Sequence, residues 1–236
     1  DVITFTAVIT DRASNPTTGT PSIDTLTVDQ TVPSVDAGTD KIVNALVAQI
    51  AAISDGGSGV ATYAWTKSVG VGTVLFSNQS GATTNANTDI SVTNASPAGD
   101  GAYTLTLSVT DVAGNSASDD ITFVWDTTAP TVVLSSGTPD PTNGFIFVVA
   151  QFSETVTDFD ETDIVIGNGA VDSFVAVDGD TYNFNVDPTD GASVAVTIDV
   201  PMTTSVDVAG NANTASNQIT RTSDTVAPAV SSITTT

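Results

Sequence analysis

The sequence contains no cysteine and no histidine. Without cysteine there are no disulfides, zinc–thiolate sites or cysteine nucleophiles, and without histidine there is no Ser-His-Asp triad or histidine metal ligand. Positive charge is also scarce, because four bases stand against 27 acids and the net charge is −23. Nucleic acids and anionic membranes are bound through basic patches, so neither is expected as a partner. The longest apolar run, residues 145–150, is too short to span a membrane.

The residues that are abundant favour an all-β protein. A length of 236 residues corresponds to one or two domains. Only Glu154 and Glu161 are glutamates, so the other 25 acids are aspartates, which favour turns, caps and calcium loops over helices. Threonine, valine, serine, alanine, glycine and asparagine dominate the rest, which is typical of strands joined by many turns.

Two short motifs repeat along the chain. The motif Asp-x-Ala-Gly-Asn occurs at 111–115 and 207–211, and residues 11–15 are a third copy with serine in place of glycine. Each copy is followed by Asp-x-x-x-Pro, and these second motifs recur after 97 and then 98 residues, at 29–33, 126–130 and 224–228. A period near 100 residues equals one small β-sandwich.

The repeats predict four segments. Residues 1–30 are interpreted as the C-terminal strands of a partial repeat, and residues 31–127 and 128–226 as two complete repeats. Residues 227–236 resemble the start of the repeat at Thr131. We therefore expect the whole chain to be a piece of a longer tandem array.

These motifs resemble the bacterial Ig-like repeats that form the stalks of large secreted adhesins, including the RTX type exported by type I secretion. The third segment adds residues 152–154 and 163–169, which are similar to one subgroup of these repeats. The second segment, with Tyr63-Ala64-Trp65 and the strand-like run 103–109, is similar to PKD-like or Ig-like modules.

The resemblance implies tandem Ig-like β-sandwiches in an elongated rod. It also implies a structural extender of an extracellular bacterial adhesin, with neighbouring repeats as its partners and no enzymatic activity. Paired carboxylates could serve a glycosidase, but two small sandwiches offer no obvious cleft. Two alternatives stay open: a subunit of a filament or surface layer that self-associates through edge strands, and a carbohydrate- or protein-binding module. An exposed aromatic cluster would mark the binding module, and the candidates are Tyr63, Trp65, Tyr182 and Trp125.

The hydrophobic pattern places strands in both complete repeats. In the second segment, residues 103–109 and 121–125 alternate apolar and polar side chains with a period of two, and Trp65 is expected in the core. Residues 41–53 fit either a helix or a strand whose apolar side carries Leu46, Ala48, Ile50 and Ala52. Their place in the repeat favours the strand.

In the third segment, Asn143-Gly144 is a tight-turn signal ahead of a strand at 145–152. The other strands are expected at 164–166, 170–177, 181–186, 193–200 and 218–222. This repeat has no tryptophan, so its core is expected to be filled by Phe145, Phe147, Phe152, Phe174 and Phe184.

In an Ig-like sandwich the linker that enters a repeat and two of its loops meet at one pole. This places two sets of acidic residues together. One set is Asp126, Glu154 and Asp207, with Asp163 nearby in sequence, and the other is Asp29, Asp111 and Asp55.

Several carboxylates at one pole repel one another. At a separation of ~4 Å and an effective dielectric constant near 20, each like-charged pair costs about 4 kcal/mol, and four bases cannot neutralise 27 acids. Calcium binds oxygen ligands with irregular, high coordination numbers, so a calcium ion is predicted at each junction. The same aspartates are also ordinary turn residues, and that alternative stays open.

Overall fold

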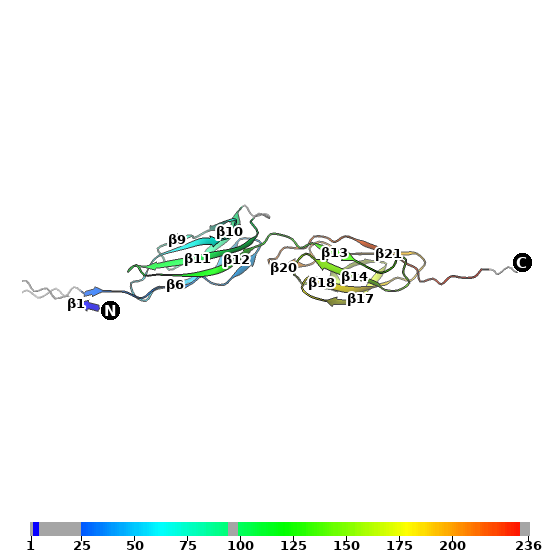
Figure 1. Cartoon of the computed structure of the whole chain (residues 1–236), viewed down its shortest axis with the longest axis horizontal. Coiled ribbons are helices and arrows are strands. Elements are labelled where there is room, and N and C mark those ends of the chain that lie inside the picture. The colour runs from blue at the N-terminus through cyan, green and yellow to red at the C-terminus, as the bar shows by residue number, and fades with distance from the viewer. Residues whose placement is uncertain (1, 5–24, 94–98, 232–236) are drawn as a thin grey trace, which may run out of the picture. The chain divides into compact units, whose positions relative to one another are not determined.

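The computed structural model describes residues 2–4, 25–93 and 99–231 (Figure 1). Apart from one 3-10 helix, η1 (Glu161–Asp163), every regular element of these residues is a strand, which confirms the all-β prediction. Within the same residues no helix is long and apolar enough to cross a membrane. The motif at 11–15 lies outside the described residues.

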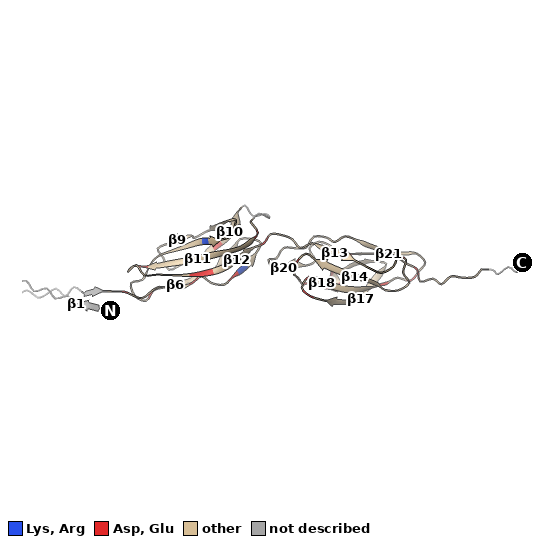
Figure 2. Ribbon diagram, viewed as in Figure 1, with Lys and Arg blue, Asp and Glu red and all other residues tan. Residues whose placement is uncertain are grey.

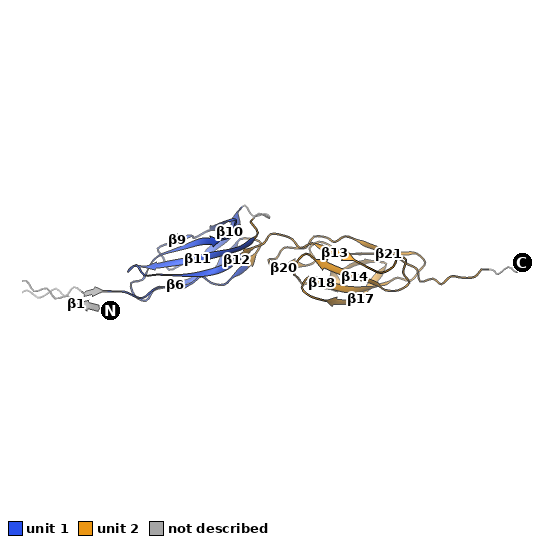
Figure 3. Ribbon diagram, in the orientation of Figure 1, with its two compact units in different colours: residues 1–41, 46–94, 101–123 blue, residues 42–45, 95–100, 124–236 orange. Residues whose placement is uncertain are grey.

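The chain divides into two compact units, which are coloured separately in Figure 3. Unit 1 comprises residues 1–41, 46–94 and 101–123, and unit 2 comprises residues 42–45, 95–100 and 124–236. Near the start of the chain, β1 (Val2–Thr4) pairs antiparallel with β2 (Thr25–Thr27).

The first sandwich is built from two antiparallel sheets and a small strand pair. The larger sheet has the order β4-β12-β11-β7-β9, the smaller has the order β5-β10-β8, and β3 pairs with β6. The rings of Trp65 on β7 and Phe76 on β8 are stacked with their centroids 6.0 Å apart, so the two sheets face each other. The strands are β3 (Ser34–Asp36), β4 (Lys41–Val43), β5 (Val47–Gln49), β6 (Ala52–Ser54), β7 (Val60–Val69), β8 (Thr73–Phe76), β9 (Ser80–Gly81), β10 (Thr88–Thr93), β11 (Gly101–Asp111) and β12 (Ser116–Trp125).

The period of two in the sequence decides which side chains fill this core. On β11 the alternate residues Tyr103, Leu105, Leu107 and Val109 are buried, and on β12 the same holds for 121, 123 and 125. The predicted strands and their inward faces are thus confirmed. Trp65 is fully buried, as expected, and its indole N–H donates to the carbonyl of Ala86 at 2.8 Å.

The segment 41–53 adopts strand conformation, but it is split into β4, β5 and β6, which belong to three different sheets. The predicted single strand with Leu46 and Ile50 on its apolar side was wrong, because both side chains are 66% exposed while Gln49 is fully buried. The amide of Gln49 donates to the carbonyls of Ala37 and Thr39. These two bonds satisfy the N–H groups of the buried amide, whereas its Oε1 has no partner among the described residues.

The second sandwich packs the sheet β13-β14-β18-β17 against the sheet β16-β19-β21, and β15 pairs with β20. One hydrophobic cluster joins the two larger sheets, with Val148 and Phe184 from one and Val196 and Ile198 from the other. The strands are β13 (Val132–Ser135), β14 (Ile146–Phe152), β15 (Val156–Thr157), β16 (Val165–Gly167), β17 (Gly169–Ala176), β18 (Thr181–Pro188), β19 (Val194–Asp199), β20 (Val206–Asp207) and β21 (Ile219–Ser223).

The aromatic core of this sandwich differs from the expected one. Phe152 and Phe184 are buried as predicted, but Phe145 and Phe147 are 52% and 46% exposed, so their assignment to the core was wrong. Phe147 alternates with the inward residues Ile146 and Val148 on β14 and therefore faces outward. Phe159 and Tyr182 supply the missing bulk, with ring centroids 4.9 Å apart.

Phenylalanines on the two faces of the sheet β13-β14-β18-β17 are predicted to differ in how much their truncation to alanine destabilises the fold. Phe184→Ala empties a buried site and should lower the free energy of unfolding by about 3–5 kcal/mol. Phe147→Ala removes an exposed ring and should change it by no more than about 0.5 kcal/mol. Urea denaturation of the chain followed by circular dichroism measures both. Equal losses in the two variants would contradict the assignment of the faces.

Candidate metal centres

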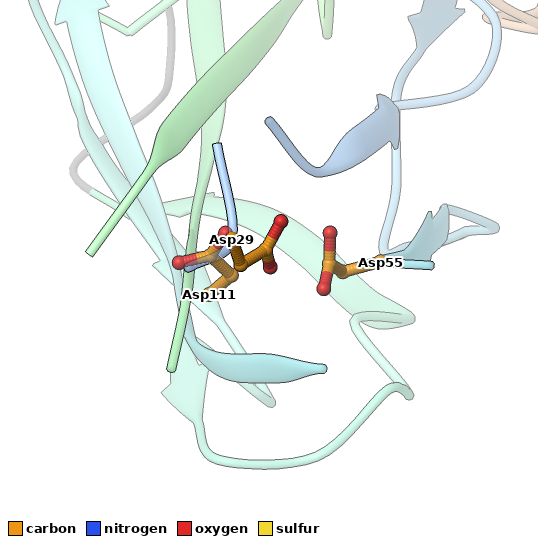
Figure 4. A group of neighbouring side chains, drawn as sticks. All are labelled: Asp29, Asp55 and Asp111. Carbon is orange, nitrogen blue, oxygen red and sulfur yellow. The ribbon is translucent and has the colours of Figure 1, made fainter. Parts of the chain in front are cut away.

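Three aspartates from separate segments of unit 1 come together (Figure 4). Asp29 precedes β3, Asp55 lies between β6 and β7, and Asp111 is the last residue of β11. One carboxylate oxygen of each lies within 4.8 Å of the others. The structure thus brings together the three residues that the repeat pattern had placed at this pole.

Asp111 is held by the turn that follows it. The side chain is 2% exposed, and Asn115 donates to both of its carboxylate oxygens, from its backbone N–H to Oδ1 and from its side-chain amide to Oδ2, each at 2.8 Å. Gly114 between them has φ +93°, in the left-handed region that glycine adopts without a steric cost. The Asp-x-Ala-Gly-Asn motif is therefore a turn that fixes a buried carboxylate.

Asp29 and Asp55 are held by backbone N–H groups. Asp29 accepts from Thr31 at 2.9 Å and from Ser58 at 2.6 Å, and these bonds, the one from Thr31 first, lower the pKa of Asp29. Asp55 Oδ2 accepts from the backbone of Gly57 and Gly59. Its Oδ1 atom is buried and has no hydrogen-bond partner among the described residues, so one oxygen of this group is left without compensation for its burial.

A hollow of about 850 Å³ borders the first group. Its wall at Gly57 depends on the absence of a side chain, because a Cβ there would overlap the carboxylate of Asp29. A side chain at position 57 would therefore push the Asp29 carboxylate away from this loop. The hollow is lined by Val28, Asp29, Gln30, Thr31, Gly57, Ser58, Val112 and Ala113.

Unit 2 contains an equivalent group formed by Asp126, Glu154 and Asp207, again with one oxygen from each within 4.8 Å of the others. Asp207 is 4% exposed and accepts from the backbone and the side-chain amide of Asn211, each at 2.8 Å. These are the same bonds, to the same atoms, that Asn115 makes to Asp111. Glu154 takes the place that Asp55 has in the first group.

Each of these asparagines also anchors the preceding linker. The side-chain amide of Asn115 donates to the carbonyl of Asp29 at 3.1 Å, and that of Asn211 donates to the carbonyl of Asp126 at 2.9 Å. One amide group therefore holds both the buried aspartate and the linker aspartate of its group. This role was not predicted from the sequence, although the repeated asparagine was the available signal.

Comparison with known families decides what these sandwiches are. Residues 126–223 match one profile of a bacterial Ig-like domain, and residues 62–127 match a second profile of the same description. The chain is built from bacterial Ig-like repeats. The resemblance inferred from the motifs is thereby confirmed, although the matches do not distinguish the RTX adhesin type.

Two of the solved structures that match the chain are remote from it in sequence. Fibronectin(III)-like modules of CbhA from Clostridium thermocellum align with 15% identity over 82% of this chain and 95% of that chain, with a TM-score of 0.34. The titin fragment A168169 aligns with 10% identity over 82% of this chain and 98% of that chain, with a TM-score of 0.28. No curated protein matches the chain.

In the second Ig-like repeat, Glu154 has an unfavourable environment for a charge. Its pKa is raised, first by desolvation and then by the negative charges of Asp126 and Asp207. The Oδ1 atom of the neighbouring Asp126 accepts from the backbone N–H of Thr128 at 3.0 Å. A cation among the three carboxylates would relieve the cost of ionising Glu154.

Asp163 lies outside both groups. It belongs to η1, where its Oδ2 accepts from the backbone N–H of Asp160 at 2.9 Å in a capping box. A carboxylate used in this way closes its own turn. Of the seven predicted ligands, the structure therefore gathers six into the two groups and leaves Asp163 apart.

Asp100 makes a contact with the linker that was not predicted from the sequence. Its two carboxylate oxygens accept from the hydroxyls of Thr127 and Thr128, at 2.9 and 2.7 Å. Desolvation is the largest influence and raises the pKa of Asp100, but the bonds from Thr128 and Thr127 together outweigh it, so the pKa is lowered overall. All three residues belong to unit 2.

The two groups offer only hard oxygen ligands, and the chain has few positive charges to balance them. Two of its four bases are engaged elsewhere: Lys67 donates to the carbonyls of Gly70 and Gly72, and Arg221 donates to those of Ser136, Thr138 and Thr220. Oxygen donors contributed by loops suit calcium, which accepts irregular coordination. The buried Oδ1 of Asp55, which has no partner among the described residues, fits such an ion in the first group.

The raised pKa of Glu154 predicts a pH dependence without metal. A carboxyl group whose folded pKa lies above its unfolded value of 4.5 contributes stability below that value and loses it as the pH rises through the folded pKa. In the presence of a chelator, Glu154→Gln should therefore gain melting temperature relative to the native chain as the pH rises from 4 to 7. Calorimetry at several pH values measures the difference.

The matched control is Glu161→Gln, which changes the only other glutamate, an exposed one. It should follow the native chain at every pH. A constant difference between Glu154→Gln and the native chain would show that Glu154 ionises without cost.

Proposed function

We propose that this chain is a spacer segment in the stalk of a large extracellular bacterial adhesin, and that calcium stiffens the linkers that enter its Ig-like repeats. One observation carries the proposal. In both units an asparagine, Asn115 or Asn211, donates its side-chain amide to the linker that precedes a sandwich, an arrangement called the asparagine clamp below. Each clamp lies beside a group of three carboxylates. A device repeated on linkers points to mechanics, since a ligand site would not need to recur there.

The linker before the second sandwich is anchored at its first residue. Strand β12 ends at Trp125, and the next residue, Asp126, belongs to the carboxylate group. The N–H of Asp126 donates to the carbonyl of Val43 at 3.0 Å, and its carbonyl accepts from Asn211. Such bonds remove the backbone freedom that makes an ordinary linker flexible.

Calcium fits the groups better than magnesium does. Magnesium requires nearly octahedral geometry and keeps much of its water, whereas calcium accepts six to eight oxygens at variable angles. The three carboxylates of each group come from separate segments of the chain rather than from one rigid element. The ion would supply the positive charge, while the clamp of Asp207 and Asn211 keeps the ligands in place.

The dimensions of the modules suit a spacer. A ten-residue strand such as β7 is about 33 Å long at ~3.3 Å per residue, so each repeat adds length at a low cost in sequence. A filament or surface-layer subunit would need open strand edges. The edge strand β17 carries a bulge between Val171 and Ser173, with the exposed Asp172 in it, a feature that protects edges from pairing with another chain.

The proposal predicts that Asp126 and Glu154 share one ion. Asp126→Asn and Glu154→Gln should each abolish calcium binding at the second group and leave the first group unchanged, because each removes a charged ligand. Extracellular modules bind calcium with dissociation constants of about 10⁻⁴–10⁻³ M. The double variant should be little worse than either single one, since both act through the same ion. Isothermal titration of the whole chain with calcium measures this.

Asp120→Asn is the control, because it removes the same charge from an exposed residue of β12 that belongs to neither group. Asp207→Asn is less informative. Asp207 accepts two bonds from Asn211, so an amide there would lose one of them with or without calcium. Unchanged affinity and stoichiometry in both Asp126→Asn and Glu154→Gln would leave these residues as turn residues only.

Calcium is also predicted to stiffen the linkers more than it folds the sandwiches. The apolar cores form without an ion, whereas the linker groups depend on relief of carboxylate repulsion. Chelation should therefore broaden the distribution of particle dimensions in small-angle scattering and lower the melting temperature slightly, and Asp126→Asn should resemble the chelated chain. Scattering that is the same with calcium and with chelator would contradict a mechanical role for the ion.

A further inference from the structure

The outer face of the sheet β13-β14-β18-β17 is a bare surface within the described part of the chain. Across this face, Phe147 on β14 lies opposite Asn185 on β18, which lies opposite Ser173 on β17. The neighbouring row places Asn183 between Val149 and Val175. Phe147 and Val175 are 46% and 57% exposed, so apolar surface stays open to solvent beside the two amides.

Asn183 and Asn185 are unusual residues for their position. Strand β18 is central, with β14 on one side and β17 on the other, and asparagine is depleted in strands. Two asparagines on the same face of a central strand break a local preference, and such departures concentrate at functional sites.

The amides of Asn183 and Asn185 also differ from the structural asparagines. Both side chains are half-buried and make no hydrogen bond to the described residues. Asn168, Asn213 and Asn217 instead donate their amides to backbone carbonyls. An unused amide offers two donors and an acceptor, so two adjacent ones form a polar row that is ready to bind hydroxyl groups.

The groove on this face is uncharged although the protein is strongly acidic, and the nearest outward charge on β18 is Asp187, two residues beyond Asn185. A shallow groove of about 270 Å³ is lined by Phe147, Ser173, Val175, Asn183, Phe184 and Asn185, none of them charged, and β14 carries no charge along its length (Figure 2). The chain as a whole has a net charge of −23. An anionic ligand would be repelled by that charge, a cation would find no carboxylate in the groove, and a second copy would bring a further −23 to the contact. The charge distribution therefore selects a neutral ligand.

From this combination we infer that the groove binds a neutral saccharide, with one sugar ring stacked on Phe147 and its hydroxyls bonded to Asn183 and Asn185. A sugar ring has an apolar C–H face and a rim of hydroxyls that both donate and accept. Small-ligand sites pair an apolar surface with a few placed polar groups in this way. The groove lies below the usual volume range of about 300–1,000 Å³ for enclosed sites, so it holds one ring and leaves the rest of a chain outside.

The inference does not rest on calcium or on the spacer role, because it concerns side chains of the sheet that belong to neither carboxylate group. It assigns a neutral saccharide to the second repeat in addition to any ion. It also moves the expected aromatic contact to Phe147, since the candidates Tyr63, Trp65, Tyr182 and Trp125 are all buried, at 3%, 0%, 6% and 6% exposure.

Nuclear magnetic resonance of the whole chain tests the inference. Maltohexaose, cellohexaose and N-acetylchitohexaose, each titrated to about 10 mM to cover millimolar affinity, serve as neutral probes. At least one should shift the side-chain amide signals of Asn183 and Asn185, with or without calcium. Phe147→Ala and the double variant Asn183→Ala, Asn185→Ala should each weaken that binding by about tenfold or more.

Phe145→Ala is the matched control, since Phe145 is an equally exposed phenylalanine that does not line the groove, and it should bind as the native chain does. Absence of amide shifts with all three probes would overturn the inference, as would equal binding by Phe147→Ala. Sedimentation is measured in parallel. Concentration-dependent association that Phe147→Ala abolishes would assign the face to a second copy and would also overturn it.

Discussion

The arrangement of both linkers depends on one side-chain interaction, the pair of hydrogen bonds between a buried aspartate and the asparagine four residues later. In the second repeat, Asn211 donates to both oxygens of Asp207 and reaches the carbonyl of Asp126 with the same amide. A carboxylate is costly to bury unless its oxygens are satisfied. The turn therefore makes a buried charge tolerable and at the same time attaches the linker to the sandwich.

The clamp has an electrostatic consequence. Fixing Asp207 brings it close to Asp126 and Glu154, and the pKa of Glu154 is raised, first by desolvation and then by the charges of Asp126 and Asp207. In the first repeat the cost takes another form, since Asp55 keeps a buried oxygen without a partner. Glu154 and Asp55, at equivalent positions, thus each carry a carboxylate whose burial is not fully compensated. A divalent cation would offset this cost in both groups. This equivalence is a stronger argument for a shared ion than any single aspartate.

Away from the linkers, the two faces of the sheet β13-β14-β18-β17 carry different kinds of side chain. The inward residues Tyr182, Phe184 and Val186 of β18 are buried in the core, while Asn183 and Asn185 between them are free of structural bonds. Because strand side chains alternate, the same strand can hold a rigid core and present an outward row of amides. A module of this kind can add length to a chain and still carry a ligand site on its surface.

Much of this architecture is determined by the sequence itself. The period of two along residues 103–109 reflects local strand geometry, and the motifs at 111–115 and 207–211 mark turns whose aspartates the repeat places at one pole. Family membership follows from the same motifs. Local patterns of this sort are readable because they depend on backbone geometry and on residues close in sequence.

Other features were decided only by tertiary structure. An alternating pattern does not say which side is the core when both sides are apolar, so Phe147 and Ile50 were placed inside although they face solvent. Gln49 points inward, where its amide donates to the carbonyls of Ala37 and Thr39. Asp163 was drawn into its own capping box, and Asn115 and Asn211 found linker carbonyls 86 and 85 residues away. Such choices depend on groups far apart in sequence that meet only when the sheets have packed.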